Sequence, residues 1–179
     1  MKKLITAFVG LAAFAVSPAF ADKGFSAGAS IGYSNISFEE DGASVDLTGT
    51  GYKLFGTYMF NDYFGIEGGW MSFGDPSDTV GGIDVEISAD GFDLFAVGAL
   101  PVSDSFDLFA KAGMLSWDAD LTVDGIDEGS DSGEDLALGI GARFTGASGF
   151  GFRAEYEYFD IVDADSVWVL SVGFEYAFK

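Results

Sequence analysis

Charged side chains set within apolar stretches are the residues of this sequence that could do chemistry. They alternate with large apolar neighbours, and the set holds both signs of charge: Lys53, Glu67, Asp93, Lys111, Arg143, Arg153, Glu155, Glu157 and Glu175. Charges removed from water require partners of opposite sign, because an unpaired buried charge is strongly destabilising. The pattern therefore predicts a polar network inside the molecule, held together by salt bridges.

Catalysis has few candidates among these residues. The sequence contains no histidine and no cysteine, which removes the commonest general base and metal ligand as well as every thiol. Glu155 and Glu157 lie on one face of a strand and could form an acid–base pair, but their position suits interior charges better. We therefore expect no enzyme activity and no cofactor.

The charged residues must be held on one face, and the sequence supplies alternating strands almost throughout. Strict alternation of apolar with small or polar residues is typical of β-strands. Eight such stretches are present, at 25–38, 51–60, 63–73, 91–100, 105–117, 135–144, 150–159 and 166–179. We therefore expect an all-β fold of eight antiparallel strands in up-and-down order.

The first 21 residues, MKKLITAFVGLAAFAVSPAFA, have the pattern of a secretory signal peptide. Lys2 and Lys3 precede an apolar stretch at 4–16, and Ala19-Phe20-Ala21 fits the small-x-small cleavage pattern. The apolar stretch is too short to span a membrane as a helix. We expect cleavage after Ala21, which makes 1–21 the signal peptide and 22–179 the folded domain.

Connections between the predicted strands alternate in length. The connections at 61–62, 101–104 and 145–149 are short, whereas those at 39–46, 75–90, 118–134 and 160–165 are mostly longer. All short turns then lie at one end of the sheet, which is typical of an outer-membrane barrel with short periplasmic turns and long extracellular loops. Three long loops also contain turn signals of β-hairpins that project from the membrane: Asp41-Gly42, Gly81-Gly82 and Asp124-Gly125.

One stretch breaks the alternation. Val85, Ile87 and Ala89 have the opposite parity to Phe92 and Leu94 on the strand that follows. A β-bulge inserts one residue and reverses the parity of a strand. The sequence therefore predicts a bulge near Asp90-Gly91.

Alternation alone would also fit a soluble lipocalin-like barrel with an apolar interior. Two features favour a transmembrane barrel with its apolar face toward lipid. The charges lie beside glycines, which suits a narrow closed lumen, and Phe55, Phe95, Phe109 and Phe159 share that inward parity. Aromatic residues gather toward both ends of the apolar face, as in the two girdles of membrane barrels: Tyr33, Phe60, Trp70, Phe150, Tyr158, Trp168, Tyr176 and Phe178.

The long loops are acidic. They hold most of the Asp and Glu residues and no Lys or Arg, and the whole chain has a formal net charge of −21. Such charge disfavours nucleic acid as a partner. The densest patch, DGIDEGSDSGED at 124–135, does not match the spacing of an EF-hand. Two interpretations stay open: a solvated, repulsive outer face, or loops bridged to lipopolysaccharide by divalent cations.

Several stretches together resemble the small eight-stranded outer-membrane β-barrels of Gram-negative bacteria, the OmpA-like and OmpX-like barrels of the porin family. They are GYKLFGTYMFNDYFGIEGGWMSFGD (51–75), LFAKAGML (108–115), FGFRAEYEYFD (150–160) and the closing GFEYAF. The resemblance implies a monomeric barrel in the outer membrane of the cell envelope. It further implies an inward Lys/Arg/Glu cluster that can act as a salt-bridge gate, and a C-terminal signal for the barrel-assembly machinery.

The chain departs from this family at two points. Lys179 follows Phe178, whereas family members usually end on the aromatic residue. The sequence also ends with the barrel, so we do not expect the cell-wall-binding domain of full OmpA proteins.

Two functions are consistent with the sequence. The first is a structural or surface-interaction role, in membrane integrity or adhesion, through the acidic extracellular loops. The alternative is a narrow porin-like channel gated by the interior salt-bridge network. The expected partners are outer-membrane lipid, lipopolysaccharide bridged by divalent cations, and the assembly machinery.

Overall fold

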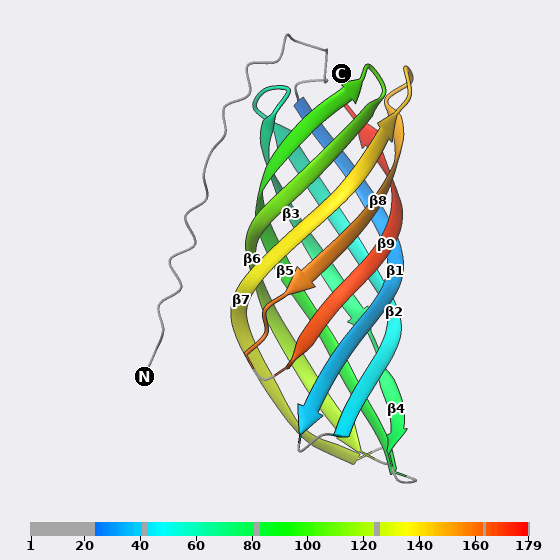
Figure 1. Ribbon diagram of the computed structural model, residues 1–179, viewed down its shortest axis with the longest axis vertical. Helices are drawn as coiled ribbons and strands as arrows, with labels where there is room; N and C mark the ends of the chain where they lie inside the picture. The colour runs from blue at the N-terminus through cyan, green and yellow to red at the C-terminus, as the bar shows by residue number, and fades with distance from the viewer. Residues whose placement is uncertain (1–23, 41–42, 81–82, 124–125, 163, 179) are drawn as a thin grey trace.

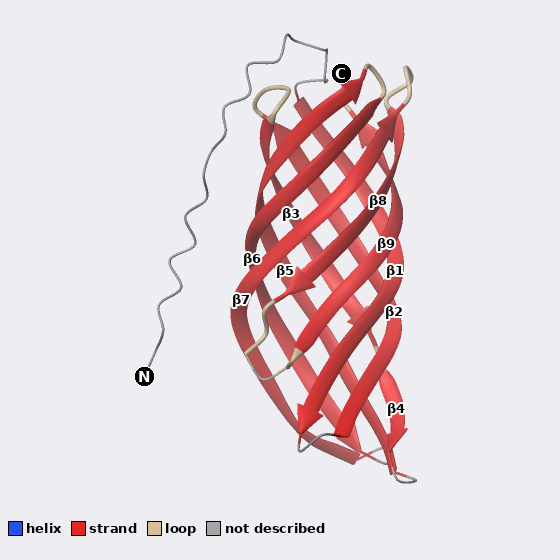
Figure 2. Ribbon diagram, viewed as in Figure 1, coloured by secondary structure: helices blue, strands red, loops and turns tan. Residues whose placement is uncertain are grey.

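The computed structural model describes residues 24–40, 43–80, 83–123, 126–162 and 164–178, which form a barrel of antiparallel strands (Figures 1 and 2). Among these residues, no helix has the length and apolar character needed to cross a membrane. The strands are β1 (Gly24–Glu40), β2 (Ala43–Met59), β3 (Phe64–Gly74), β4 (Ser77–Val80), β5 (Ile83–Ser103), β6 (Phe106–Val123), β7 (Ile126–Thr145), β8 (Phe150–Phe159) and β9 (Ser166–Ala177). The predicted signal peptide and its cleavage site lie outside the described residues.

The sheet closes on itself through its first and last strands. β1 pairs with β2 on one side and with β9 on the other, from Ser26↔Ala177 to Ser37↔Ser166. Over the described residues from Ser26 to Ser37, this closure pairs β1 on both sides, so that backbone groups are satisfied as lipid requires. The prediction of an eight-stranded up-and-down barrel is confirmed, with the short β4 added in the connection between β3 and β5.

The two ends of the barrel differ as predicted. Short turns join β2 to β3, β5 to β6 and β7 to β8 at the end where β9 finishes, at the top of Figure 1. At the opposite end the strands continue as hairpins, and pairing reaches Glu40↔Ala43, Val80↔Ile83 and Val123↔Ile126. Most residues of three predicted long loops are therefore strand, and their two-residue turns lie outside the described residues.

Large apolar side chains cover the outer surface between these ends. Leu170, Val172 and Phe174 on β9 are exposed, whereas Ser171 and Glu175 are buried. All eight aromatic residues predicted as girdles lie on this outer face. At the short-turn end the rings of Phe150 and Tyr176 lie 4.8 Å apart, and at the other end those of Tyr33 and Trp168 lie 5.6 Å apart.

Beyond the aromatic residues at the extracellular end, apolar residues occupy the inward positions of the strands and polar residues occupy the outward positions. Apolar residues there are buried inside the barrel, including Ile36, Leu47, Phe73, Ala89 and Leu115, while Asp46, Asp90 and Asp118 are exposed. A sheet with water on its outer side places its apolar residues on the other side. We infer that the inversion marks where the strands leave the membrane at the extracellular end.

The predicted bulge near Asp90-Gly91 is wrong as placed. Pairing of β5 with β6 is regular from Val85 to Pro101, so β5 runs through this point without an inserted residue. The register instead shifts on the neighbouring strand β3, between Ser72 and Gly74. Ala89 has the opposite parity to Phe92 because Ala89 faces the inside of the barrel, where apolar residues are buried at this end.

Candidate functional site

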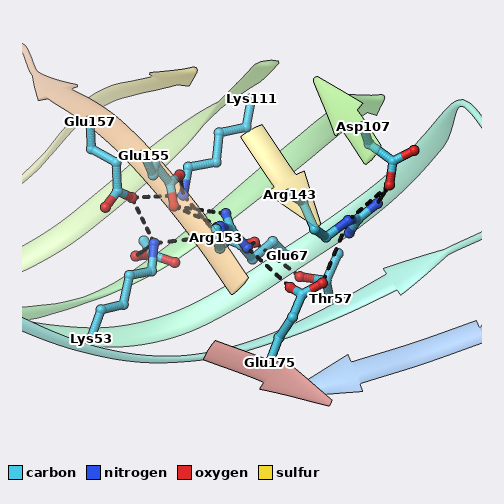
Figure 3. A network of polar contacts seen from close by, with 11 residues as sticks. Lys53, Thr57, Glu67, Asp107, Lys111, Arg143, Arg153, Glu155, Glu157 and Glu175 are labelled. Atoms are coloured by element: carbon cyan, nitrogen blue, oxygen red, sulfur yellow. Dashed lines mark hydrogen bonds and ion pairs between the residues drawn. The ribbon is translucent and has the colours of Figure 1, made fainter. Parts of the chain in front are cut away.

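The charged residues predicted as a network all lie inside the barrel. They come from seven strands and are buried, with at most 9% of any residue exposed. Figure 3 shows most of them pointing toward one another across the lumen. The contributions are Lys53 from β2, Glu67 from β3, Asp93 from β5, Lys111 from β6, Arg143 from β7, Arg153, Glu155 and Glu157 from β8, and Glu175 from β9.

Glu67 lies at the centre of the network. Its Oε1 lies 2.8 Å from Lys111 Nζ and 3.4 Å from Lys53 Nζ. Its Oε2 lies 2.6 Å from Arg153 Nη1 and accepts a 2.9 Å hydrogen bond from the Thr57 hydroxyl. One carboxylate therefore joins three cations from three other strands.

The two carboxylates of β8 link the same cations from the opposite wall. Glu157 Oε1 lies 2.7 Å from both Lys53 Nζ and Lys111 Nζ. Glu155 contacts Lys111 and also pairs with Arg153 Nη2 at 2.8 Å. Both carboxylates are therefore engaged in salt bridges inside the lumen.

A second group of charges lies nearer the short-turn end. Arg143 Nη2 donates to Asp107 Oδ2 at 3.1 Å, and its Nε lies 3.5 Å from Glu175 Oε1. Glu175 Oε2 reaches Arg153 Nη1 at 4.0 Å, which connects this group to the central one. In the central group, Lys53 Nζ also pairs with Asp93 Oδ2 at 2.7 Å. All nine predicted residues thus belong to one connected network.

Sequence reasoning missed two members of this network, Asp107 and Thr57. Asp107 is buried and has the same parity on β6 as Lys111, so the alternation contained the signal that would have found it. Asp107 also lies directly opposite Arg143 in the pairing of β6 with β7. Thr57 is uncharged, and only its hydrogen bond to Glu67 reveals its role.

Aromatic rings fill the space between the charges. Phe95 lies beneath both lysines, with its ring centre 4.2 Å from Lys111 Nζ and 5.0 Å from Lys53 Nζ. The guanidinium of Arg153 lies between Phe55 and Phe109, at 4.5 and 4.4 Å from their ring centres. A void of about 10 Å³ remains beside Lys53 and Glu157, room for about one water molecule. The lumen is closed at this level.

The network contains fewer cations than carboxylates. Its four cations, Lys53, Lys111, Arg143 and Arg153, are the only Lys and Arg residues between 24 and 178. They contact six carboxylates, so each cation serves more than one acidic partner. Within the described residues no group of three or more acidic side chains is arranged to hold a metal ion. The arrangement can neutralise charge and hold opposite walls of the barrel together.

Comparison with known proteins places this geometry in a family. The outer membrane protein beta-barrel domain matches residues 6–178. Outer membrane protein A of Yersinia pseudotuberculosis serotype I (strain IP32953) is 28% identical over 196 residues, covering 98% of this chain and 54% of that protein. The attachment invasion locus protein of the same strain is 29% identical over 158 residues and 82% of each chain.

A solved structure shows the same architecture. The crystal structure of Ail, the attachment invasion locus protein of Yersinia pestis, in complex with the heparin analogue sucrose octasulfate, matches with a TM-score of 0.62 and 26% identity. The match covers 88% of this chain and all of that one. The chain spans about half the length of the outer membrane protein A that it matches. From its family match, its closed barrel and these relatives, the chain belongs to the outer membrane protein beta-barrel domain family of Gram-negative outer-membrane proteins.

Proposed function

We propose that this protein has a structural and surface-interaction role, in which the barrel anchors projecting hairpins that contact other molecules. The observation that carries the proposal is the closed lumen, where every described cation is committed to interior salt bridges. A barrel filled in this way serves as a rigid anchor. The engagement of Glu155 and Glu157 in salt bridges also argues against catalysis.

The alternative is a narrow channel gated by the same network. Opening would require several charges from opposite walls to exchange partners while remaining paired, since an unpaired charge in this interior is costly. Phe55, Phe95 and Phe109 would also have to leave the lumen that they fill. The geometry therefore favours the structural role.

The charge of the projecting hairpins indicates which molecules their outer surface would bind. Ail has been solved with a polysulfated ligand, but here the four cations between residues 24 and 178 lie within the lumen. Exposed carboxylates such as Glu86, Asp118 and Glu134 cover the outer side of β5, β6 and β7. We propose that this surface contacts cationic partners directly, and lipopolysaccharide through divalent cations.

The remaining proposals concern export and assembly. We propose that the chain is cleaved after Ala21 and enters the outer membrane through the barrel-assembly machinery, which would bind the closing GFEYAF sequence. A monomer is sufficient because pairing of β1 with β9 leaves no edge strand free. The aromatic residues on the outer face would then lie at the two membrane interfaces.

Oligolysine binding to the protein in zwitterionic lipid nanodiscs tests the surface role. Neutralising two extracellular carboxylates, Asp118→Asn with Glu134→Gln, should weaken binding at low salt by roughly 1.5- to 5-fold for each carboxylate. The matched control, Asp62→Asn with Asp104→Asn, removes equal charge at the short-turn end and should have a smaller effect. Equal weakening by both pairs, or tight binding of heparin to the unmodified protein, would contradict the proposal.

A further inference from the structure

The extracellular end of the barrel encloses a cavity separate from the ion-pair network. Its volume is about 500 Å³, and it is lined mainly by apolar side chains, among them Ile36, Phe73, Ile87, Trp117, Ala119 and Ile161. Sites for small organic ligands typically measure roughly 300–1,000 Å³ and have mostly apolar walls with a few polar groups. This cavity has the size and lining of such a site.

The wall of the cavity is held in place by specific contacts. Trp117 Nε1 donates a 2.8 Å hydrogen bond to Asp135 Oδ2, which fixes the indole. Gly133 lies opposite Trp117 in the pairing of β6 with β7, and a Cβ there would lie 3.0 Å from Cζ2 of the indole. The absence of a side chain at Gly133 therefore makes room for the ring. Phe73 packs edge-on against Phe159, with ring centres 5.3 Å apart.

The connection between β8 and β9 contributes to the wall of the cavity. These two strands stop short of β1 and β7 at the extracellular end, as Figure 1 shows. The connection is fixed to both neighbours, because the Asp160 amide donates to Leu136 at 2.9 Å and the Asp165 amide donates to Ser37 at 3.0 Å. Ile161 and Ala164 from this connection form one edge of the cavity. Hydrogen bonds therefore hold the residues next to Ile161 and Ala164 against β7 and β1.

The charge at the cavity selects the kind of ligand. Asp131 lines it and is exposed, opposite Ala119 in the pairing of β6 with β7. One of its carboxylate oxygens accepts a 2.8 Å hydrogen bond from the Ser132 amide. The only Lys and Arg residues between 24 and 178 lie in the lumen network. The aromatic rings of Trp117 and Phe73 also favour a cation over an anion.

We propose that this cavity binds a small cationic amphiphile, with its apolar body beside Trp117 and its ammonium group at Asp131. Burial of the apolar body supplies the driving force, and the carboxylate with the aromatic walls supplies the preference for positive charge. The proposal rests on the cavity and is independent of the surface role proposed above.

Three ligands with one apolar body test the proposal: 1-aminoadamantane, 1-adamantanol and 1-adamantanecarboxylate. The full-length mature barrel is placed in zwitterionic nanodiscs with Trp70→Phe and Trp168→Phe, so that emission reports Trp117 alone. The amine should cause a saturable blue shift, the alcohol should bind more weakly, and the carboxylate should bind most weakly. Absence of a saturable shift with the amine, or equal binding of the carboxylate, would overturn the proposal.

Variants locate the site. Ala119→Phe on β6 and Ala164→Phe in the connection between β8 and β9 each fill the cavity and should abolish the shift, whereas Ser116→Phe on the outer face should not. Asp131→Asn should weaken amine binding roughly two- to fivefold and leave alcohol binding unchanged, while the matched Asp104→Asn, at an exposed carboxylate of the short-turn end, should change neither. Retention of binding in both cavity-filling variants, with folding verified by the heat-dependent gel shift, would also overturn the proposal.

Discussion

Replacing Lys111 with methionine should lower the free energy of unfolding by about 3–5 kcal/mol, the cost of breaking a buried ion pair by removing one partner. The side chain of Lys111 is fully buried and contacts Glu67 at 2.8 Å, Glu157 at 2.7 Å and also Glu155. Methionine preserves most of the volume but leaves three carboxylates with fewer cations. Urea unfolding of the barrel in phosphatidylcholine vesicles, followed by gel mobility, measures the loss.

A compensating variant distinguishes charge from packing in this experiment. Adding Glu157→Gln to Lys111→Met removes one charge of each sign, so the double variant should recover part of the lost stability. If packing alone were responsible, the second substitution would add to the loss. A cost below about 1 kcal/mol for Lys111→Met, the size expected of an exposed pair, would contradict the described network.

Replacing Val172 with arginine should cost about 2–4 kcal/mol, the value for a cation on the lipid face at the middle of the membrane. Val172 lies on β9 midway between Trp168 and Tyr176, which belong to the two aromatic groups, and 63% of it is exposed on the outer face. Lipid would surround the guanidinium there, and the same unfolding measurement in vesicles gives the cost.

Val162 provides the matched position for this test. It is 84% exposed in the connection between β8 and β9, beyond the extracellular aromatic residues. Val162→Arg should therefore change stability by less than about 1 kcal/mol, as near the interface. Equal costs at the two positions would show that the assigned membrane boundaries are wrong.

Alternation was sufficient to predict the membrane-spanning part of the fold. Along β9, Leu170 and Val172 face outward while Ser171 and Glu175 face inward, and the same parity locates Lys53 and Lys111 inside the barrel. This succeeded because the side-chain period of a strand is two residues and lipid tolerates few polar groups on the outer face. The pairs across the lumen, such as Lys53 with Glu157, depend on the tilt and stagger of the strands, which parity does not determine.

The extracellular hairpins show the limit of that reasoning. The inward positions of Ile36 and Ala89 follow from the same alternation once the outer side of the strand is in water. The predicted bulge at Asp90-Gly91 is wrong because the outer face of β5 meets two environments, lipid along one part of the strand and water along the other. The change of solvent along a single strand is a property of the assembled barrel in its membrane, and it also creates the apolar cavity around Trp117.

Ion conductance across a planar lipid bilayer tests most directly the central claim that the lumen is closed. The mature protein is inserted, folding is verified by the heat-dependent gel shift, and currents are recorded over a range of voltages. With Phe95 beneath the two lysines and Arg153 held between Phe55 and Phe109, we predict no current steps above those of the protein-free bilayer. Reproducible steps that scale with salt concentration would contradict a closed lumen and favour the gated channel.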